Sequence, residues 1–233
     1  MKQAATLVLL LATIASAQTP APIPAAQVPQ RKEIFSNHHV TAYLLQLAPN
    51  ESTPMHVHDR DFLTVFVTGG KVRHTEFGHR PASENIPLGT VRFRNTGFAH
   101  STQNQSSHRL RAVIVEFAEP QGKTEKVGTK NSHYCNPGSE TVCVDEKYLF
   151  CTAKVCVEDV TMAAGAVSSK HSHTTDHMLI AISDYQLTDQ VEGKGKTVRT
   201  RWSGEIEYIP AGITHQLTNT GKGAARFIVL VWR

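Results

Sequence analysis

Residues 165–173 read GAVSSKHSH, and residues 204–219 read GEIEYIPAGITHQLTN. The first stretch places His171 and His173 at alternate positions, and the second contains His215. Alternate residues of a β-strand point to the same side, so both imidazoles of the pair can face one interior. A histidine from a later strand can then complete a set of three nitrogen ligands. The two stretches therefore predict a β protein that binds a transition metal.

The same pattern occurs earlier in the chain. A shift of 115 positions carries His56 onto His171 and needs no gap. The aligned pairs are His56–His171, His58–His173, Asp61–Asp176, Gly89–Gly204, Gly97–Gly212, His100–His215, Asn104–Asn219 and Arg111–Arg226. One H-x-H pair is expected by chance in a chain with 13 histidines, but this many matches in a single register indicate an internal duplication.

The duplication divides the chain into two predicted β domains, residues 31–118 and 147–233, joined by a linker over residues 119–146. Short apolar or alternating runs occur in both domains, such as residues 41–47 (TAYLLQL) and 227–232 (FIVLVW). Gly, Pro, Asn and Asp separate these runs, which is typical of short strands. Regularly spaced short strands indicate a sandwich or a barrel.

The N-terminus resembles an export signal. Residues 1–17 (MKQAATLVLLLATIASA) combine a basic start, a short apolar run and small residues before Gln18. The apolar run is shorter than the roughly 20 residues that cross a bilayer. Residues 18–30 are rich in Pro, Ala and Gln and are expected to form an extended, poorly ordered spacer. We therefore expect a secreted or periplasmic protein with no membrane association once the signal is removed.

Composition narrows the expected partners. Apolar residues make up 40% of the chain and charged residues 19%, which excludes a disordered tail, a coiled coil or a collagen-like fibre. The 24 basic residues are scattered among 20 acidic ones. A nucleic-acid-binding protein usually gathers its Lys and Arg into a stripe, so no nucleic-acid partner is expected. The expected partner is a small molecule, and the sequence leaves the oligomeric state open.

Four cysteines, Cys135, Cys143, Cys151 and Cys156, lie between the two histidine patterns. An even number in an exported chain favours two structural disulfides, and the C-x2-C spacing typical of a zinc knuckle is absent. Four cysteines allow three connectivities, and the sequence does not choose among them. The turn-like residues 136–139 favour Cys135 with Cys143. Cys151 and Cys156 could pair only across a tight hairpin turn.

The spacing in the second copy resembles the two motifs of the cupin superfamily. The fixed positions of these motifs are occupied by Gly165, His171, His173, Gly204, Pro210, Gly212, His215 and Asn219. The first copy matches less closely, because Asn50 and Asn95 replace a Gly and a Pro. The resemblance covers nearly all of the chain after the spacer and implies a two-domain cupin, or bicupin. Such a protein is all-β, with two tandem jelly-roll (double-stranded β-helix) barrels, each with a metal site in its mouth.

Seven histidines are candidate metal ligands: His56, His58 and His100 in the first copy, and His171, His173, His177 and His215 in the second. Many metal-binding cupins have a Glu four or five residues after the second histidine, and neither copy has it. The manganese-dependent oxalate-degrading cupins have this Glu, so their chemistry is not implied here. Asp61 and Asp176 come one residue earlier. Strand parity turns them away from the histidines unless a bulge re-aims them, so they are candidate ligands or rim residues.

A site made of imidazoles favours Zn, Cu, Fe or Ni over Mg or Ca. The first hypothesis is an exported metal-dependent enzyme, with three-His, dioxygenase-like chemistry on a small organic acid or phenol. One alternative is a cupin that binds a small ligand without catalysis. Another is a chain with one active barrel and one degenerate structural barrel, which the looser first copy favours. Fold alone does not choose among these functions.

The remaining histidines are expected at the surface, because polar side chains are mostly exposed. They are His38, His39, His74, His79, His108 and His133. Asn104 and Asn219 are expected to orient the candidate ligands. The closer motif match of the second copy predicts that it binds metal more tightly than the first.

Overall fold

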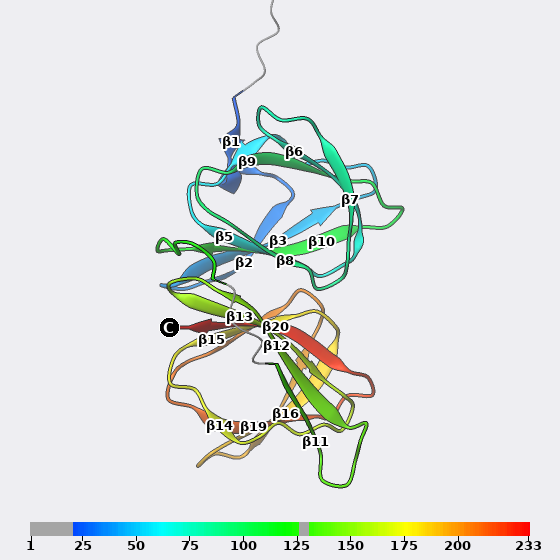
Figure 1. Cartoon of the computed structure of the whole chain (residues 1–233), viewed down its shortest axis with the longest axis vertical. Coiled ribbons are helices and arrows are strands. Elements are labelled where there is room, and N and C mark those ends of the chain that lie inside the picture. Colours follow the sequence, from blue (N-terminus) through cyan, green and yellow to red (C-terminus); the bar gives the residue numbers. More distant parts are fainter. Residues whose placement is uncertain (1–20, 126–130) are drawn as a thin grey trace, which may run out of the picture.

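The computed structural model describes residues 21–125 and 131–233. This part of the chain forms strands β1 to β20 and a single 3-10 turn at Ala25–Gln27 (Figure 1). The all-β prediction is therefore confirmed. The predicted export signal lies outside the described residues. Among the residues described, no helix has the length and apolar character needed to cross a membrane.

The first half contributes ten strands in two sheets. Their bounds are β1 Ile23–Pro24, β2 Arg31–Ser36, β3 Val40–Leu47, β4 His56–Val57, β5 Phe62–Phe66, β6 Gly70–Glu76, β7 Ala82–Ile86, β8 Val91–Arg94, β9 Ala99–Asn104 and β10 Leu110–Phe117. One sheet has the order β1-β4-β9-β6-β7, and the other has the order β2-β3-β10-β5-β8. Leu47 and Phe62 of the second sheet share a core cluster with Val72 of the first, so the two sheets face each other.

The second half repeats this arrangement. Its strands are β11 Ser132–Cys135, β12 Cys143–Cys151, β13 Val155–Met162, β14 His171–Ser172, β15 His177–Ala181, β16 Tyr185–Val191, β17 Lys196–Arg201, β18 Ile206–Ile209, β19 Thr214–Asn219 and β20 Ala225–Trp232. They form one sheet in the order β11-β12-β13-β20-β15-β18 and another in the order β14-β19-β16-β17. A shift of 115 residues carries β3, β9 and β10 onto β13, β19 and β20 with identical bounds. The duplication is thus visible strand by strand.

Two segments that the sequence analysis placed outside the domains belong to the sheets. In the expected spacer, β1 pairs in parallel with β4, and Ala25 and Val28 are buried. In the expected linker, residues 132–146 form β11 and the start of β12, which pairs with β13. A sheet edge offers unpaired backbone groups that a neighbouring segment can satisfy. Composition does not reveal that kind of pairing.

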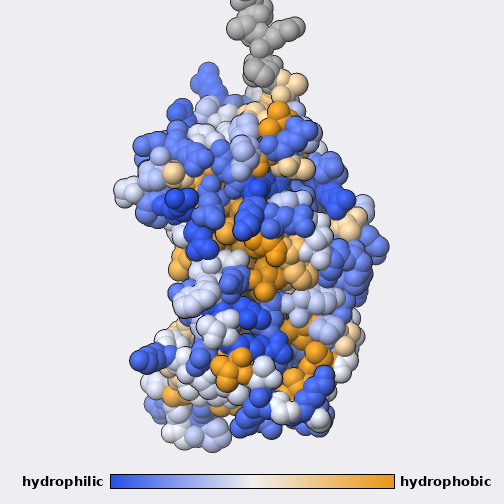
Figure 2. All heavy atoms as spheres, turned by 180° about the vertical axis from the view of Figure 1, so that it is seen from behind, coloured by the Kyte–Doolittle hydropathy of each residue, from blue (hydrophilic) through white to orange (hydrophobic). Residues whose placement is uncertain are grey.

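The two halves meet through the sheets that contain β10 and β20, stacked along the long axis of the molecule (Figure 1). Val113 and Val115 of β10 share a core cluster with Ile228 and Leu230 of β20. Ile114, between the two valines, belongs instead to the cluster inside the first half. Both faces of β10 are therefore buried, which explains its nearly uninterrupted apolar sequence. On the rear face, apolar residues reach the surface near the middle of the molecule (Figure 2).

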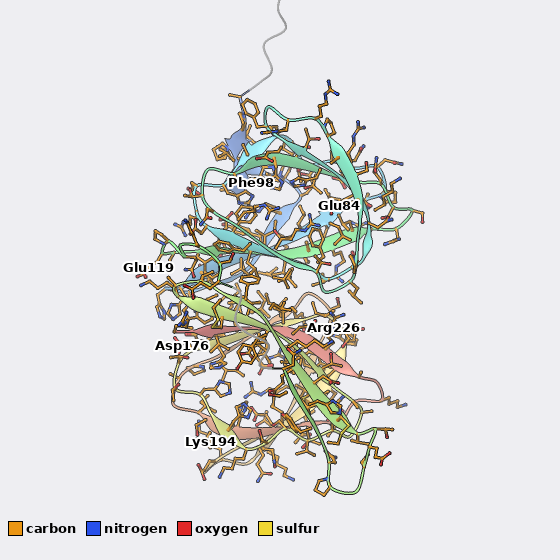
Figure 3. All side chains as sticks on the ribbon, viewed as in Figure 1. Glu84, Phe98, Glu119, Asp176, Lys194 and Arg226 are labelled. Atoms are coloured by element: carbon orange, nitrogen blue, oxygen red, sulfur yellow. A yellow bond between two sulfur atoms is a disulfide. The ribbon has the colours of Figure 1, made fainter. Side chains whose placement is uncertain are left out.

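Two arginines cross this interface in opposite directions. Arg111 Nη2 donates to the Ser203 carbonyl at 2.7 Å. Arg226, the equivalent residue in the second half, donates from Nη1 to the Leu88 carbonyl at 3.3 Å (Figure 3). Ser203 and Leu88 are themselves equivalent under the 115-residue shift, so the contacts are reciprocal. The two halves therefore meet in a pseudo-twofold arrangement, in which the same surface of each copy is used.

The motif glycines next to these carbonyls leave room for the arginines. A Cβ on Gly89 would lie 2.5 Å from Arg226 Nη2, and a Cβ on Gly204 would lie 2.9 Å from Arg111 Nη2. Both glycines also have positive φ, at 81° and 88°. The lack of a side chain at Gly89 and Gly204 thus makes room for the contact between the halves, and their positive φ suits their turns.

We predict that Gly89→Ala lowers the free energy of unfolding more than Gly97→Ala does. Both glycines have φ near +80°, so each substitution strains the backbone by about 1 to 2 kcal/mol. No atom lies within 4 Å of a Cβ at Gly97, whereas a Cβ at Gly89 displaces the Arg226 guanidinium. Because the displaced group is the flexible end of an arginine, the added loss is that of its hydrogen bond to the Leu88 carbonyl, about 0.5 to 1.5 kcal/mol. Urea denaturation of both variants measures the difference, and equal losses would contradict the role of Gly89 at the interface.

The structure contains two disulfides, Cys135–Cys143 and Cys151–Cys156, as expected. The first joins directly opposed residues of β11 and β12, and the second joins opposed residues of β12 and β13. The hairpin at residues 152–155 brings Cys151 and Cys156 to a Cα separation of 4.0 Å. These bonds therefore tie down the strands that precede the second histidine triad.

Loss of either disulfide should destabilise the protein without changing its metal content. Closing loops of 8 and 5 residues stabilises the fold by about 2 to 3 kcal/mol each in the chain-entropy account. The Cys135→Ser/Cys143→Ser variant should therefore unfold at lower denaturant concentration. Mass spectrometry after alkylation of the unreduced protein, isolated from its natural compartment, should find no free thiol. Four alkylated cysteines would show that the bonds do not form in the natural compartment.

Candidate metal centres

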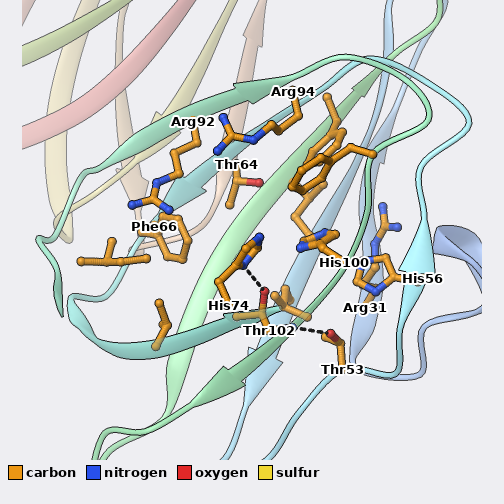
Figure 4. Close-up of a pocket in the computed structure, with 16 residues that line it drawn as sticks. Arg31, Thr53, His56, Thr64, Phe66, His74, Arg92, Arg94, His100 and Thr102 are labelled. Carbon is orange, nitrogen blue, oxygen red and sulfur yellow. Dashed lines mark hydrogen bonds between the residues drawn. The ribbon is translucent and has the colours of Figure 1, made fainter. Parts of the chain in front are cut away.

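His56, His58 and His100 converge inside the first half. His56 lies opposite His100 in the antiparallel pair of β4 and β9, and one ring nitrogen from each of the three residues lies within 4.8 Å of the others. His58 Nε2 is 3.3 Å from His100 Nε2. Figure 4 shows His56 and His100 in the wall of the adjoining cavity. The structure thus brings together all three histidines predicted for this copy.

His171, His173 and His215 form the equivalent group in the second half. His171 lies opposite His215 in the pair of β14 and β19. The Nε2 atom of His215 is 2.7 Å from that of His173 and 3.2 Å from that of His171. The predicted convergence of an H-x-H pair with a later histidine is therefore present in both copies.

Hydrogen bonds at Nδ1 determine which nitrogen of these rings carries the hydrogen. His171 Nδ1 is 2.9 Å from the Ser169 carbonyl, and His215 Nδ1 is 2.8 Å from the Asp189 carboxylate. Both partners only accept, so both Nδ1 atoms donate and both Nε2 atoms present lone pairs. Two such lone pairs facing each other at 3.2 Å repel unless a cation lies between them. The donor set therefore fits a divalent metal ion.

The first triad is oriented in a similar way by different partners. His56 Nδ1 donates to the Pro54 carbonyl at 2.9 Å, and His58 Nδ1 donates to the Glu116 carboxylate at 3.1 Å. Glu116 also forms an ion pair with Arg31 at 2.6 Å. The carboxylate in this copy thus supports the second histidine of the H-x-H pair, whereas Asp189 supports the later histidine of the other copy.

Burial keeps the imidazoles in the neutral form that binds metal. Desolvation lowers the pKa of His56 to about 4 and that of His173 to about 3. The same cause lowers the pKa values of His58, His100 and His215. Metal binding at neutral pH therefore needs no proton to be removed from these five rings.

His177 is not one of the three converging residues. Its Nδ1 donates to the Thr175 carbonyl at 2.8 Å, and its ring packs edge-on against His173 with 3.9 Å between centroids. Phe62 occupies the equivalent position and stacks on His58 at 3.6 Å. The ring at this position thus forms a wall of the site in both copies. A role for His177 as a fourth ligand stays a prediction.

The two aspartates hold loops and do not face the triads. Asp61 accepts backbone N–H groups from Thr96 at 2.8 Å and from Gln121 at 2.6 Å. Asp176 accepts a backbone N–H and pairs with His39 Nε2 at 2.8 Å, across the junction of the two halves (Figure 3). Both orientations agree with the strand-parity argument, which predicts that these aspartates point away from the histidines.

Three residues around the triads were missed by sequence reasoning. Glu116 was indicated by its position as the one charge inside the apolar run of residues 112–117. Asp189 and His74 are equivalent under the 115-residue shift, and each lies two residues after a buried residue of its strand, so each points inward. His74 lines the first cavity, with its ring centroid 4.8 Å from that of His100. The expectation that His74 lies at the surface was wrong.

Other expectations about polar residues had mixed outcomes. His38, His79, His108 and His133 are exposed as expected, and His39 is half-buried through its contact with Asp176. Asn104 and Asn219 do not orient the histidines. Each instead donates from its side-chain amide to three backbone carbonyls, including those that end the preceding strands at Leu47 and Met162.

The two triads open into cavities of different size. The cavity at the first triad has a volume of about 50 Å³, and the cavity at the second has a volume of about 310 Å³. Small-molecule sites usually have about 300 to 1,000 Å³. Only the second cavity reaches this range.

Comparison with known proteins identifies the fold. No family model and no curated protein matches the chain. Among solved structures, AerE from Microcystis aeruginosa is 13% identical, with 88% of this chain and 98% of that chain covered and a TM-score of 0.60. The putative glyoxylate-induced protein from Pseudomonas aeruginosa is 15% identical, with coverage of 89% and 83% and a TM-score of 0.61. A Bacillus subtilis oxalate decarboxylase mutant is 14% identical, with coverage of 90% and 76% and a TM-score of 0.59. All three are cupin-fold proteins, and the likeness shows that this chain has the cupin fold.

We predict that Glu116→Gln and Asp189→Asn each weaken metal binding at their own triad. Each change removes the negative charge that orients and polarises a ligand histidine, and the loss of such a partner typically reduces metal affinity about 10- to 100-fold. Competition with a chromophoric chelator measures the affinity. Asp145→Asn is the matched control, because Asp145 lies outside both triads and, among the described residues, its ion-pair partner is the exposed His133. An unchanged metal affinity in both site variants would show that Glu116 and Asp189 do not assist metal binding by their histidine partners.

Proposed function

We propose that the chain is an exported, metal-binding bicupin and that it acts as a metal-dependent enzyme on a small organic molecule. In this proposal, residues 31–118 and 147–233 form two tandem barrels, and β1, β11 and the start of β12 are added at their edges. The observation that carries the proposal is the pair of bare Nε2 atoms of His171 and His215, 3.2 Å apart in a cupin fold. Two disulfides and the N-terminal pattern support export.

The second triad is the proposed reaction centre. His171, His173 and His215 would hold the metal, which would supply Lewis acidity or redox chemistry to a bound substrate. Asp189 holds the His215 ring in its ligating tautomer. Leu179 and the ring of His177 contribute to one side of the cavity wall. The chain's own residues thus orient the ligands and shape the substrate space.

The proposed metal is Zn, Cu, Fe or Ni. Three neutral imidazoles suit these ions, whereas carboxylate and water ligands suit Mn. Oxalate decarboxylase from Bacillus subtilis has Mn(II) centres. Neither triad here contains a carboxylate. After export, metal choice follows raw affinity, so we expect Zn or Cu in protein isolated from its natural compartment.

The cavity volumes favour a division in which one copy catalyses and the other stabilises. The first cavity, at about 50 Å³, has room for a few atoms, whereas the second has about 310 Å³.

A binding protein without chemistry remains the second candidate function, because the second cavity alone would suffice to hold a ligand.

Oxygen uptake by iron-loaded protein tests the enzyme proposal. Turnover of at least one phenol or small organic acid from a substrate panel is expected. His215→Ala should abolish it, because this change removes a ligand from the second triad, while His100→Ala should retain it. If turnover is lost in His100→Ala but kept in His215→Ala, the reaction takes place at the first triad and the proposed reaction centre is wrong. Binding of panel compounds by metal-loaded protein without any oxygen uptake would replace the enzyme with the binding protein.

A further inference from the structure

The wall of the first cavity is basic. Arg31, Arg92 and Arg94 line it, and Figure 4 shows Arg92 and Arg94 entering from the same strand. Arg31 pairs with Glu116, and both terminal nitrogens of Arg92 contact the Glu84 carboxylate at 2.7 Å. These two pairs are neutral overall.

Arg94 supplies the remaining charge of this wall. Its Nη1 donates to the Phe93 carbonyl, and its guanidinium lies 5.3 Å from the centre of the Phe98 ring. Within the part of the chain that the structure describes, no carboxylate lies within ion-pair distance of Arg94. The first cavity therefore has one unpaired cation in its wall before any metal is counted, and because Arg94 is exposed, water screens part of this charge.

The wall of the second cavity is acidic. Glu146 and Glu158 line it together with Tyr148, which lies opposite Glu158 in the pair of β12 and β13. Glu146 accepts a hydrogen bond from the Tyr134 hydroxyl at 3.1 Å. The described residues that line this cavity include no Lys or Arg. Desolvation and the nearby Glu146 raise the pKa of Glu158, so its carboxyl group retains a proton to higher pH and can both donate and accept.

The difference lies at equivalent positions of the duplication. The 115-residue shift carries Arg31 onto Glu146, so a basic wall residue becomes an acidic one. The same shift carries Arg94 onto Ile209, which removes the unpaired cation. The Glu84–Arg92 pair becomes the Arg199–Glu207 pair, with the two charges exchanged. The first two changes both make the second cavity less positive than the first. The exchanged ion pair is neutral in both copies and does not contribute to this difference.

The charges of the two cavity walls, added to that of a bound metal dication, predict that the two sites prefer ligands of different charge. A metal dication in the first triad adds to the charge of Arg94, so this site attracts an anion. A dication in the second triad has no Lys or Arg beside it among the described lining residues, and the Glu146 carboxylate offsets part of its charge, so an anionic ligand gains less there than in the first site. Like charges placed together at an interface cost several kcal/mol, which is enough to exclude one ligand class.

We propose that the second site selects a neutral, hydroxyl-bearing ligand with an apolar body, recognised by Glu146, Glu158 and Tyr148, while the first site takes only a small anion. This inference rests on metal binding at both triads, as proposed above. The hydroxyl of such a ligand can hydrogen-bond to the glutamates, and its body can contact the apolar residues Val160, Leu179 and Phe227. Of the two substrate classes suggested by the sequence, this choice favours the phenol over the organic acid.

Titration of the cobalt-loaded His100→Ala protein tests the second site alone. Phenol and benzoate are probes of similar size, and the visible spectrum of bound Co(II) reports ligand binding. We expect phenol to bind about tenfold more tightly than benzoate, a difference equivalent to about 1.4 kcal/mol. The Glu146→Gln/Glu158→Gln variant should narrow this ratio to about twofold or less. Glu192→Gln is the matched control, because Glu192 is paired with the exposed Lys170 outside the cavity.

The complementary experiment uses the cobalt-loaded His215→Ala protein, which keeps only the first triad. Formate should change its spectrum at lower concentration than methanol does, and Arg94→Ala should remove that preference. Arg73→Ala is the control, since Arg73 is exposed on β6. Benzoate that binds the second site as well as phenol does, or failure of both probes to bind, would overturn the inference while leaving the metal sites intact. Absence of any cobalt spectrum in the unsubstituted protein would instead overturn the proposed function.

Discussion

The burial of both faces of β10 and β20 is the constraint on which the rest of the structure depends. One set of alternate residues on each strand packs against the other half of the chain, and the intervening set faces a cavity. Any change in the register of β10 would therefore move residues between the interface and the site. Glu116 illustrates this coupling, because its carboxylate reaches His58 only while Val115 packs between the halves.

The reciprocal arginine contacts fix the relative orientation of the two packed sheets. Apolar burial alone would let two flat sheets slide or rotate, since the hydrophobic effect is non-directional. Arg111 and Arg226 each reach a specific carbonyl of the other half and occupy the space next to a motif glycine. The glycines that the sequence motif requires in each copy are thus also the points at which the copies recognise each other.

The triads show how two copies of one sequence can diverge while keeping the same chemistry at their centre. Each triad places neutral imidazoles with their Nε2 atoms together, and in each a carboxylate supports one ring. The supported ring differs, because Glu116 has no acidic equivalent in the second copy and Asp189 is replaced by His74 in the first. Central ligands are held by geometry common to both copies, whereas the surrounding residues are free to change charge.

Much of this arrangement could be predicted from sequence because the 115-residue register is a long-range constraint. It equates His56 with His171 and His100 with His215, and the alternate spacing of the H-x-H pairs together with the cupin-like motifs then predicts that these histidines converge in each copy. Residues that come from other strands, such as Glu116, could not be assigned to the site, since an inward charge on an apolar strand can serve many partners. The edge strands β1 and β11 were missed for a related reason: they depend on backbone pairing, which side-chain pattern does not report.

The number of metal ions bound per chain tests the central claim of two histidine centres most directly. Elemental analysis of the folded, disulfide-bonded protein after saturation with Zn and removal of free metal should give about two ions per chain, one for each triad. His100→Ala and His215→Ala should each give about one, and the double variant none. A folded protein that binds no metal, or a double variant that keeps two ions, would contradict the account.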